Sequence, residues 1–135
     1  MAIIHKYTFG KEERLKSSIR IARLFATGHS LAKYPFKVFW DYEAANTQTV
    51  PVKIAISVPK KNFRKAVDRN LIKRRLREVH RKNKFILADV LKEKNIQIVL
   101  IVLYLPDKIL EYNEIHTGYV RLLKELLFII SAADA

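Results

Sequence analysis

The sequence predicts an α+β fold in which a mostly antiparallel sheet packs against an arginine-rich helix. Segments with the period of strands alternate along the chain with segments that have the period of helices. Half of the 135 residues are hydrophobic, which is enough to bury a core. No repeat, low-complexity tract or linker divides residues 1–135, so we expect one domain, a two-layer α/β sandwich with the order α-β-β(-β)-α-β-α.

The first helix is expected between residues 11 and 28, where Gly28 supplies a stop. Apolar residues recur there at three- and four-residue steps, as on one face of an amphipathic helix: Leu15, Ile19, Ala22 and Ala26. Ile21 and Phe25 are also four residues apart and lie at the edge of this stripe. At that edge they can belong either to the core or to a binding site.

Two strands are expected next, in residues 34–43 and 49–60, which are rich in aromatic and β-branched side chains. A turn at residues 45–48 would join them as an antiparallel hairpin. The second strand alternates large apolar residues with small or cationic ones, so one of its faces is apolar: Val52, Ile54, Ile56 and Val58. The opposite faces of both strands would form a shallow trough with aromatic and cationic contacts: Lys37, Phe39, Lys53, Ala55 and Ser57.

The second half of the chain predicts further helices around a buried strand. Residues 66–82 have helical period, and residues 85–95 fit a continuation or a second short helix. Residues 96–105 are nearly all apolar, as expected of a strand buried on both faces and ended by Pro106. The last segment is helical in period despite Gly118, with one apolar face: Ile115, Tyr119, Leu122, Leu126 and Ile129.

Positive charge is concentrated between Lys60 and Lys84, a segment that carries a net charge of +10 out of +13 for the whole chain. On a helical wheel seven polar side chains of the predicted helix gather in an arc of about 140°. We call them the basic ridge: Arg69, Asn70, Lys73, Arg74, Arg77, His80 and Arg81. The remaining side could pack on the sheet: Leu71, Ile72, Leu76 and Val79.

The basic ridge contains no acidic residue, which argues against an ordinary solvated face stabilised by ion pairs. Like charges four residues apart destabilise a helix by a few tenths of a kcal/mol each, so an external polyanion is expected to compensate. A membrane-surface helix would need bulky apolar residues beside its cations, and this helix uses them for its core. A nucleic-acid backbone is therefore favoured, with Lys60 and Lys61 beside the ridge.

Catalysis by protein side chains is not predicted. The chain has no cysteine, the thirteen acidic residues are dispersed, and the histidines share no catalytic or metal-binding spacing: His5, His29, His80 and His116. His80 is interpreted as a phosphate contact or a spectator. The N-terminus lacks the pattern of a signal peptide, and the longest apolar run is far short of the roughly 20 residues of a membrane span. We therefore expect a cytoplasmic protein with no metal site and no membrane partner.

Several motifs resemble those of the bacterial ribonuclease P protein family. The run "RNLIKRRLRE" at residues 69–78 is similar to the family's arginine-rich motif. The segments "ISVPKK" and "AVDRN" precede it as in the family, and "IARLFATGHSL" resembles the family's first helix and turn. Two features depart from the pattern. Residues 62–65 read "NFRK" where the family often has a glycine, and Ile21 occupies a position that is commonly aromatic.

The resemblance implies a protein subunit of the ribonucleoprotein that removes 5′ leaders from precursor tRNA. It implies catalysis by the RNA subunit with bound Mg²⁺, and as partners the catalytic RNA and precursor tRNA, with no protein partner required. The residues expected to face the RNA subunit are Lys60, Lys61, Arg69, Asn70, Lys73, Arg74, Arg77 and Arg81. The leader is expected in a cleft between the first helix and the sheet, at Ile21, Phe25, Phe39, Lys53 and Ser57.

Other interpretations stay open at this point. Phe39 is as compatible with the core as with the leader site, and the core is favoured for Phe36 and Trp40. A structural RNA-binding protein, such as a ribosomal protein, could use the same helix to hold folded RNA. A metal-dependent nuclease would cleave without an RNA partner, and a membrane-surface protein would bind anionic vesicles.

Overall fold

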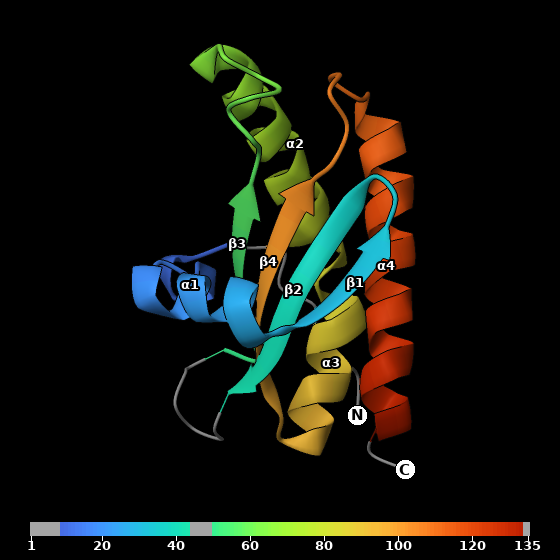
Figure 1. Ribbon diagram of the computed structural model, residues 1–135. Helices are drawn as coiled ribbons and strands as arrows, with labels where there is room; N and C mark the ends of the chain where they lie inside the picture. The colour runs from blue at the N-terminus through green and yellow to red at the C-terminus, as the bar shows by residue number, and fades with distance from the viewer. Residues whose placement is uncertain (1–8, 44–49, 134–135) are drawn as a thin grey trace.

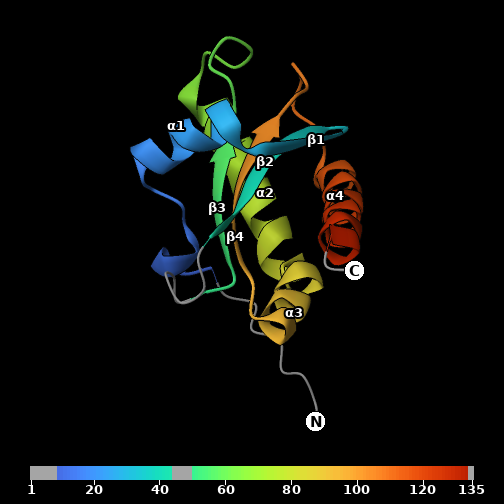
Figure 2. The same cartoon turned by 60° about the horizontal axis from the view of Figure 1, so that its bottom comes forward.

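The computed structural model describes residues 9–43 and 50–133, which form a four-stranded sheet with helices on both of its faces (Figures 1 and 2). The elements in chain order are a 3-10 helix η1 (Lys11–Glu13), α1 (Ser18–Thr27), β1 (His29–Lys33), β2 (Phe36–Glu43), β3 (Val52–Ser57), α2 (Ala66–Asn83), α3 (Phe85–Lys94), β4 (Gln97–Tyr104) and α4 (Tyr112–Ala133). The predicted α+β class and order are confirmed, and α3 is the second short helix. The predicted turn at residues 45–48 lies outside the described residues.

The strands are ordered β1-β2-β4-β3 across the sheet. β2 pairs antiparallel with β1 and with β4, whereas β3 pairs parallel with β4, so the sheet is mostly antiparallel as predicted. The predicted hairpin between residues 34–43 and 49–60 is wrong, because β4 lies between β2 and β3. The physical reason is the apolar sequence of β4, which is almost completely buried and needs a neighbouring strand on each side.

Helices α2, α3 and α4 cover one face of the sheet and enclose the main core with it (Figure 2). The predicted apolar face of β3 points into this core, as do alternate residues of β2 and β4. The helices contribute most of the residues that their periodicity predicts. Those that are fully buried are Ile72, Leu76, Val79, Ile115, Tyr119, Leu122 and Leu126.

Gly118 lies in the middle of α4, where a glycine ordinarily weakens a helix by about 1 kcal/mol relative to alanine. The turn between β1 and β2 packs directly on it. A Cβ atom at this position would lie 2.3 Å from Cδ of Pro35, which is far inside van der Waals contact. Gly118 therefore lets the β1–β2 turn approach the backbone of α4.

The predicted apolar stripe of the first helix is wrong. Leu15 precedes α1 in extended chain and donates its N–H to the carbonyl of Ile54 at 2.9 Å. Within α1 the stripe points to solvent: Ile19 is 72% exposed, and the two alanines are exposed as well. The helix instead packs through Leu24 and Ile21, which are larger than the alanines and bury more apolar area.

Candidate nucleic-acid interface

Helix α1 lies across the face of the sheet that α2, α3 and α4 leave open (Figure 2). Beneath it, Val99 and Ile101 of β4 are buried together with Leu15 and Leu24. Ile21, Phe39 and Ala55 are partly buried against this small cluster: they join α1 to the strands on either side of β4. We call the region the α1–sheet surface, and its predicted members are Ile21, Phe25, Phe39, Lys53 and Ser57.

The strand register places the sheet residues of this surface on one face, as predicted. Phe39 and Ala55 are both aligned with Ile101, one on each side of β4. Lys53 is aligned with Val99 and Ser57 with Leu103, so both point to the same side as Ala55. Because β4 intervenes, β2 and β3 are about 10 Å apart, twice the usual strand spacing. The surface is therefore wider than the predicted trough, and β4 supplies its floor.

The two phenylalanines of the α1–sheet surface contact each other. The rings of Phe25 and Phe39 have their centroids 4.9 Å apart at an angle of 60°. Lys37 places its Nζ 5.2 Å from the centroid of Phe39, which is a cation–π distance. Phe25 is 45% exposed, whereas Phe36 and Trp40 are buried in the core as favoured above. An exposed ring beside a cation can stack a base and attract the adjoining phosphate.

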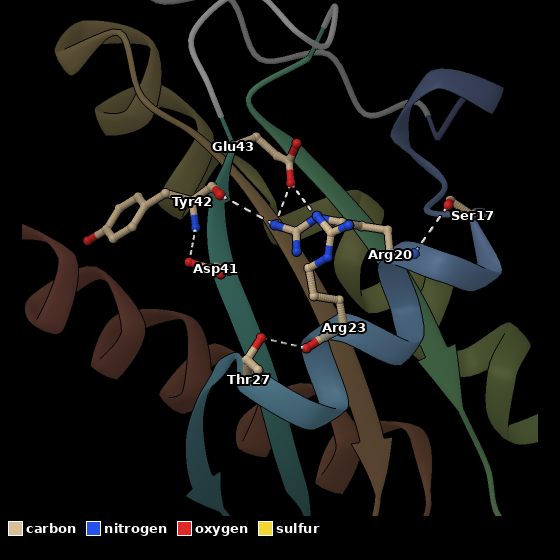
Figure 3. A network of polar contacts seen from close by, with 7 residues as sticks. All are labelled: Ser17, Arg20, Arg23, Thr27, Asp41, Tyr42 and Glu43. Carbon is tan, nitrogen blue, oxygen red and sulfur yellow. Dashed lines mark hydrogen bonds and ion pairs between the residues drawn. The ribbon is translucent and has the colours of Figure 1, made fainter.

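A polar network fixes one end of α1 to the end of β2 (Figure 3). Nε of Arg20 donates to Oε1 of Glu43 at 2.5 Å, and the two side chains form an ion pair. A second nitrogen of the guanidinium, Nη2, donates a longer hydrogen bond of 3.4 Å to the carbonyl of Tyr42. Ser17 caps the helix by accepting the backbone N–H of Arg20. This pairing was not predicted, because it joins residues 23 positions apart and leaves no local signal.

The middle of the basic ridge is open to solvent. Asn70, Arg74 and Arg77 are exposed, and Lys73 is half-buried. Within residues 9–43 and 50–133, the side chains of Lys73, Arg74 and Arg77 form no hydrogen bond or ion pair. The charge at this part of α2 is thus uncompensated within the described chain, and an anion of another molecule can supply the missing charge.

The two lysines beside the ridge belong to the turn that connects β3 to α2. Lys60 and Lys61 are both exposed there, and Pro59 separates them from the buried Val58. Backbone hydrogen bonds from Asn62 and Phe63 to the carbonyl of Pro59 close the turn. β3 therefore leads from the α1–sheet surface directly into the basic segment.

Arg69 has a structural contact that the wheel did not indicate. Its Nη1 donates to the carbonyls of Phe63 at 2.7 Å and of Arg64 at 3.0 Å. Phe63 is itself buried, with its ring centroid 5.9 Å from that of Tyr104. The "NFRK" stretch thus folds back on the core, and Arg69 holds its carbonyls next to the first turns of α2.

The C-terminal end of the basic ridge is paired, contrary to the expectation that the ridge lacks an acidic partner. Nη2 of Arg81 lies 2.5 Å from Oε1 of Glu78, and Nζ of Lys82 lies 3.7 Å from the same oxygen. The hydrogen bond from Arg81 lowers the pKa of Glu78 below its ordinary value. On the wheel Glu78 falls just outside the chosen arc, but side chains three or four positions apart still meet.

The interpretation of His80 as a phosphate contact or a spectator on the ridge is wrong, because the ring belongs to the core. His80 is 2% exposed, and its Nδ1 shares a hydrogen bond of 2.5 Å with the hydroxyl of Tyr119. Burial lowers the pKa of His80 to about 3, and the positive charge of Lys84 acts in the same direction. The residue stands at the margin of the arc, on the side where α2 packs against α4, so its ring turns inward.

The described residues contain no group of three or more His, Asp or Glu side chains that could hold a metal ion. Across the same residues, no helix combines the length and the apolar character needed to cross a membrane. The features that the structure does bring together are cations, exposed aromatic rings and a polar amide. Side chains of these kinds are suited to binding an anionic polymer.

Comparison with known proteins identifies the class and then the family. The fold is that of a small α+β protein, and its basic and aromatic surfaces are of the kind that suits a nucleic acid. The family model described as Ribonuclease P matches residues 9–127. The ribonuclease P protein component of Porphyromonas gingivalis is 34% identical over 114 residues, which span 80% of each chain. That of Chlorobium phaeobacteroides is 31% identical over 115 residues, or 80% of this chain and 79% of that protein. The chain belongs to the ribonuclease P protein family.

Solved structures agree with this assignment. The RNase P protein of Staphylococcus aureus superposes with a TM-score of 0.66 and 28% identity, over 84% of this chain and 94% of the other. The RNase P protein of Thermotoga maritima gives a TM-score of 0.67 over 84% and 96% of the two chains. At 23% identity the second comparison supports the fold alone.

Proposed function

We propose that this chain is the protein subunit of ribonuclease P, which binds the catalytic RNA and the 5′ leader of precursor tRNA and so promotes endonucleolytic removal of the leader. One observation carries the proposal. In a chain of the ribonuclease P protein family, the middle of the arginine-rich motif presents Lys73, Arg74 and Arg77 to solvent without a partner among the described residues. Such a cluster is suited to phosphates of a folded RNA.

The RNA subunit is proposed to bind along the exposed side of α2 and the turn before it. Lys73, Arg74 and Arg77 contact phosphates there, Asn70 adds a directional hydrogen bond, and Lys60 and Lys61 extend the contact. The remaining two predicted residues act differently. Arg69 orders the preceding turn through its backbone contacts, and the charge of Arg81 is shared with Glu78.

The leader is proposed to lie on the α1–sheet surface. A base stacks on the exposed ring of Phe25, while Phe39 supports that ring from below. Lys37 and Lys53 attract phosphates on either side, and Ser57 offers a hydroxyl. Stacking on an aromatic ring favours single strands without requiring a particular base, since every base has a π-face.

Cleavage is proposed to be the work of the RNA subunit, which binds Mg²⁺. The protein contributes affinity and position: it neutralises phosphates of the RNA subunit and binds precursor more tightly than mature product because only the precursor carries a leader. This role places the protein in the cytoplasm with its RNA partners, and it needs no second protein.

The direct test is cleavage of a precursor tRNA at low Mg²⁺ with protein alone, catalytic RNA alone and the two combined. Activity only or chiefly in the mixture is the expected result. Cleavage by the protein alone would instead establish a metal-dependent nuclease. Tight RNA binding with no stimulation of 5′ maturation would overturn the proposal and leave a structural RNA-binding protein.

A further inference from the structure

Helix α1 is a short element with few contacts that hold it in place. It has ten residues, and helices shorter than about 12–15 residues are marginal on their own. Leu24 is its one fully buried residue, while Ile21 is half-buried. The position of α1 on the sheet therefore depends on a small number of tertiary contacts.

Two side-chain contacts join α1 to the same strand, β2. The rings of Phe25 and Phe39 meet at one point. At the other, Arg20 pairs with Glu43 (Figure 3). Phe39 and Glu43 are four residues apart on one face of β2, about 13 Å along the strand. Arg20 and Phe25 are about 7.5 Å apart along the helix axis. Two separated contacts of this kind determine the angle at which α1 crosses β2.

The ion pair is sheltered rather than surface-exposed. The side chains of Arg20 and Glu43 are 16% and 24% exposed, and Arg20 also reaches the carbonyl of Tyr42. An arginine that donates to both a carboxylate and a carbonyl has a fixed direction, because its guanidinium is planar. Its charge is also neutralised by Glu43, which makes it a poor phosphate contact.

We infer that the Arg20–Glu43 ion pair positions the leader-binding surface by holding α1 at the angle that keeps Phe25 stacked against Phe39. Arg20 and Glu43 are positioning residues that need not touch the RNA. The inference rests on the proposed function of the α1–sheet surface. Without the pair, α1 pivots about Leu24, the two rings separate, and the platform for a leader base is lost. The main core lies on the opposite face of the sheet and stays intact.

Charge makes this inference testable against direct RNA contact. Glu43→Gln removes a negative charge and releases Arg20. If Arg20 or the local positive charge attracted RNA directly, this variant would bind precursor and mature tRNA more tightly. If the pair positions α1, the variant loses preference for precursor although it has become more positive.

The experiment uses the reconstituted holoenzyme and measures Kd for leader-bearing precursor and for mature tRNA. The variants are Glu43→Gln, Arg20→Gln and the double variant, with Arg23→Gln as the control that removes one exposed positive charge from the same helix. Each single variant is expected to lower the precursor preference by about threefold, equivalent to part of one stacking contact. The double variant should lose no more than either single variant, and Arg23→Gln should keep the preference.

Arg20→Lys provides a variant that keeps the charge but cannot reproduce the planar contact, and we expect it to recover part of the preference. Thermal unfolding of each protein confirms that the comparison is made on folded chains. An unchanged or increased preference in folded Glu43→Gln would overturn the inference, as would additive losses in the double variant. A wild-type holoenzyme that binds precursor and mature tRNA equally would overturn the proposed leader site itself.

Discussion

The two faces of the sheet differ in how completely helices cover them. One face, which we call the closed face, lies beneath α2, α3 and α4 and forms a continuous core with them. The other, the open face, carries only the ten residues of α1. Both faces are apolar at β4, where Val99 and Ile101 on one side are as buried as Leu100 and Val102 on the other. The faces differ around β4: on the α1 side, Phe25 is exposed and Phe39 only partly buried. A partly covered aromatic face is suited to binding, while a fully covered one is suited to stability.

The largest expected effect on binding concerns the solvent-exposed side of α2. Arg74→Ala/Arg77→Ala should weaken binding of the catalytic RNA by about tenfold for each lost phosphate contact and lower the salt slope by about one unit each. Affinity measured across a series of salt concentrations tests this. The fold should be unaffected, because both side chains are exposed and unpaired among the described residues. Lys124→Ala, an exposed cation on α4, is the control, and equal losses in it would contradict the assignment to α2.

The closed face should resist even a single added methyl group at Gly118. Gly118→Ala would ordinarily stabilise a helix, but its Cβ would lie 2.3 Å from the ring of Pro35. We expect the free energy of unfolding to fall by about 2 kcal/mol, in the range of overpacked cores. Urea denaturation measures it. Thr117→Ala, at an exposed neighbouring position, should change stability little, and a stabilised Gly118→Ala would show that the turn does not pack as described.

The closed face should also make stability depend on pH through His80. The unfolded chain protonates His80 near its ordinary pKa of 6.5, whereas the folded protein keeps it neutral down to about 3. The unfolded state therefore binds more protons between these values. The free energy of unfolding should fall with falling pH, by up to about 1.4 kcal/mol per pH unit.

Denaturation of His80→Gln, compared with wild type from pH 7 to pH 5, measures this contribution. The variant should have a flatter pH dependence than wild type. Identical slopes in wild type and His80→Gln would mean that His80 is accessible to protons in the folded state.

The open face should yield the smallest effect, and one on recognition alone. Phe25→Ala should reduce the preference for precursor over mature tRNA by about fivefold, within the range of one aromatic stacking contact. Ile19→Ala, on the outer side of the same helix, removes a comparable apolar group and should leave the preference unchanged. Equal losses for precursor and mature tRNA in Phe25→Ala would remove this ring from the leader site.

The order and type of the elements could be predicted, because helical and strand periods are local properties of the chain. The pairing of strands could not, since it depends on residues far apart in the sequence. One signal was present: a strand such as β4 that is apolar on both faces favours a central position, between two other strands of the sheet. The prediction of the buried face of α1 was also wrong, because it treated Leu15 as part of the helix. Leu15 precedes the helix, which begins at Ser18.

For the site residues, too, local features could be predicted and long-range contacts could not. The wheel placed Arg74 and Arg77 correctly on the exposed side, because the helix is regular there. It failed at its margins, where Glu78 meets Arg81 and where His80 turns toward Tyr119. The Arg20–Glu43 pair had no local signal at all. The angular position of a residue on one helix does not predict which residues of other elements will contact it.

The central place of β4 also has a consequence for the order in which the chain can fold. The β1–β2 pairing joins neighbours in sequence, whereas the pairings of β2 and β3 with β4 both await a segment that ends at residue 104. The basic stretch from Lys60 to Lys84 lies between β3 and β4 and is made before either pairing exists. During synthesis the ribosome therefore releases the most positively charged part of the chain before the sheet that will support it has formed.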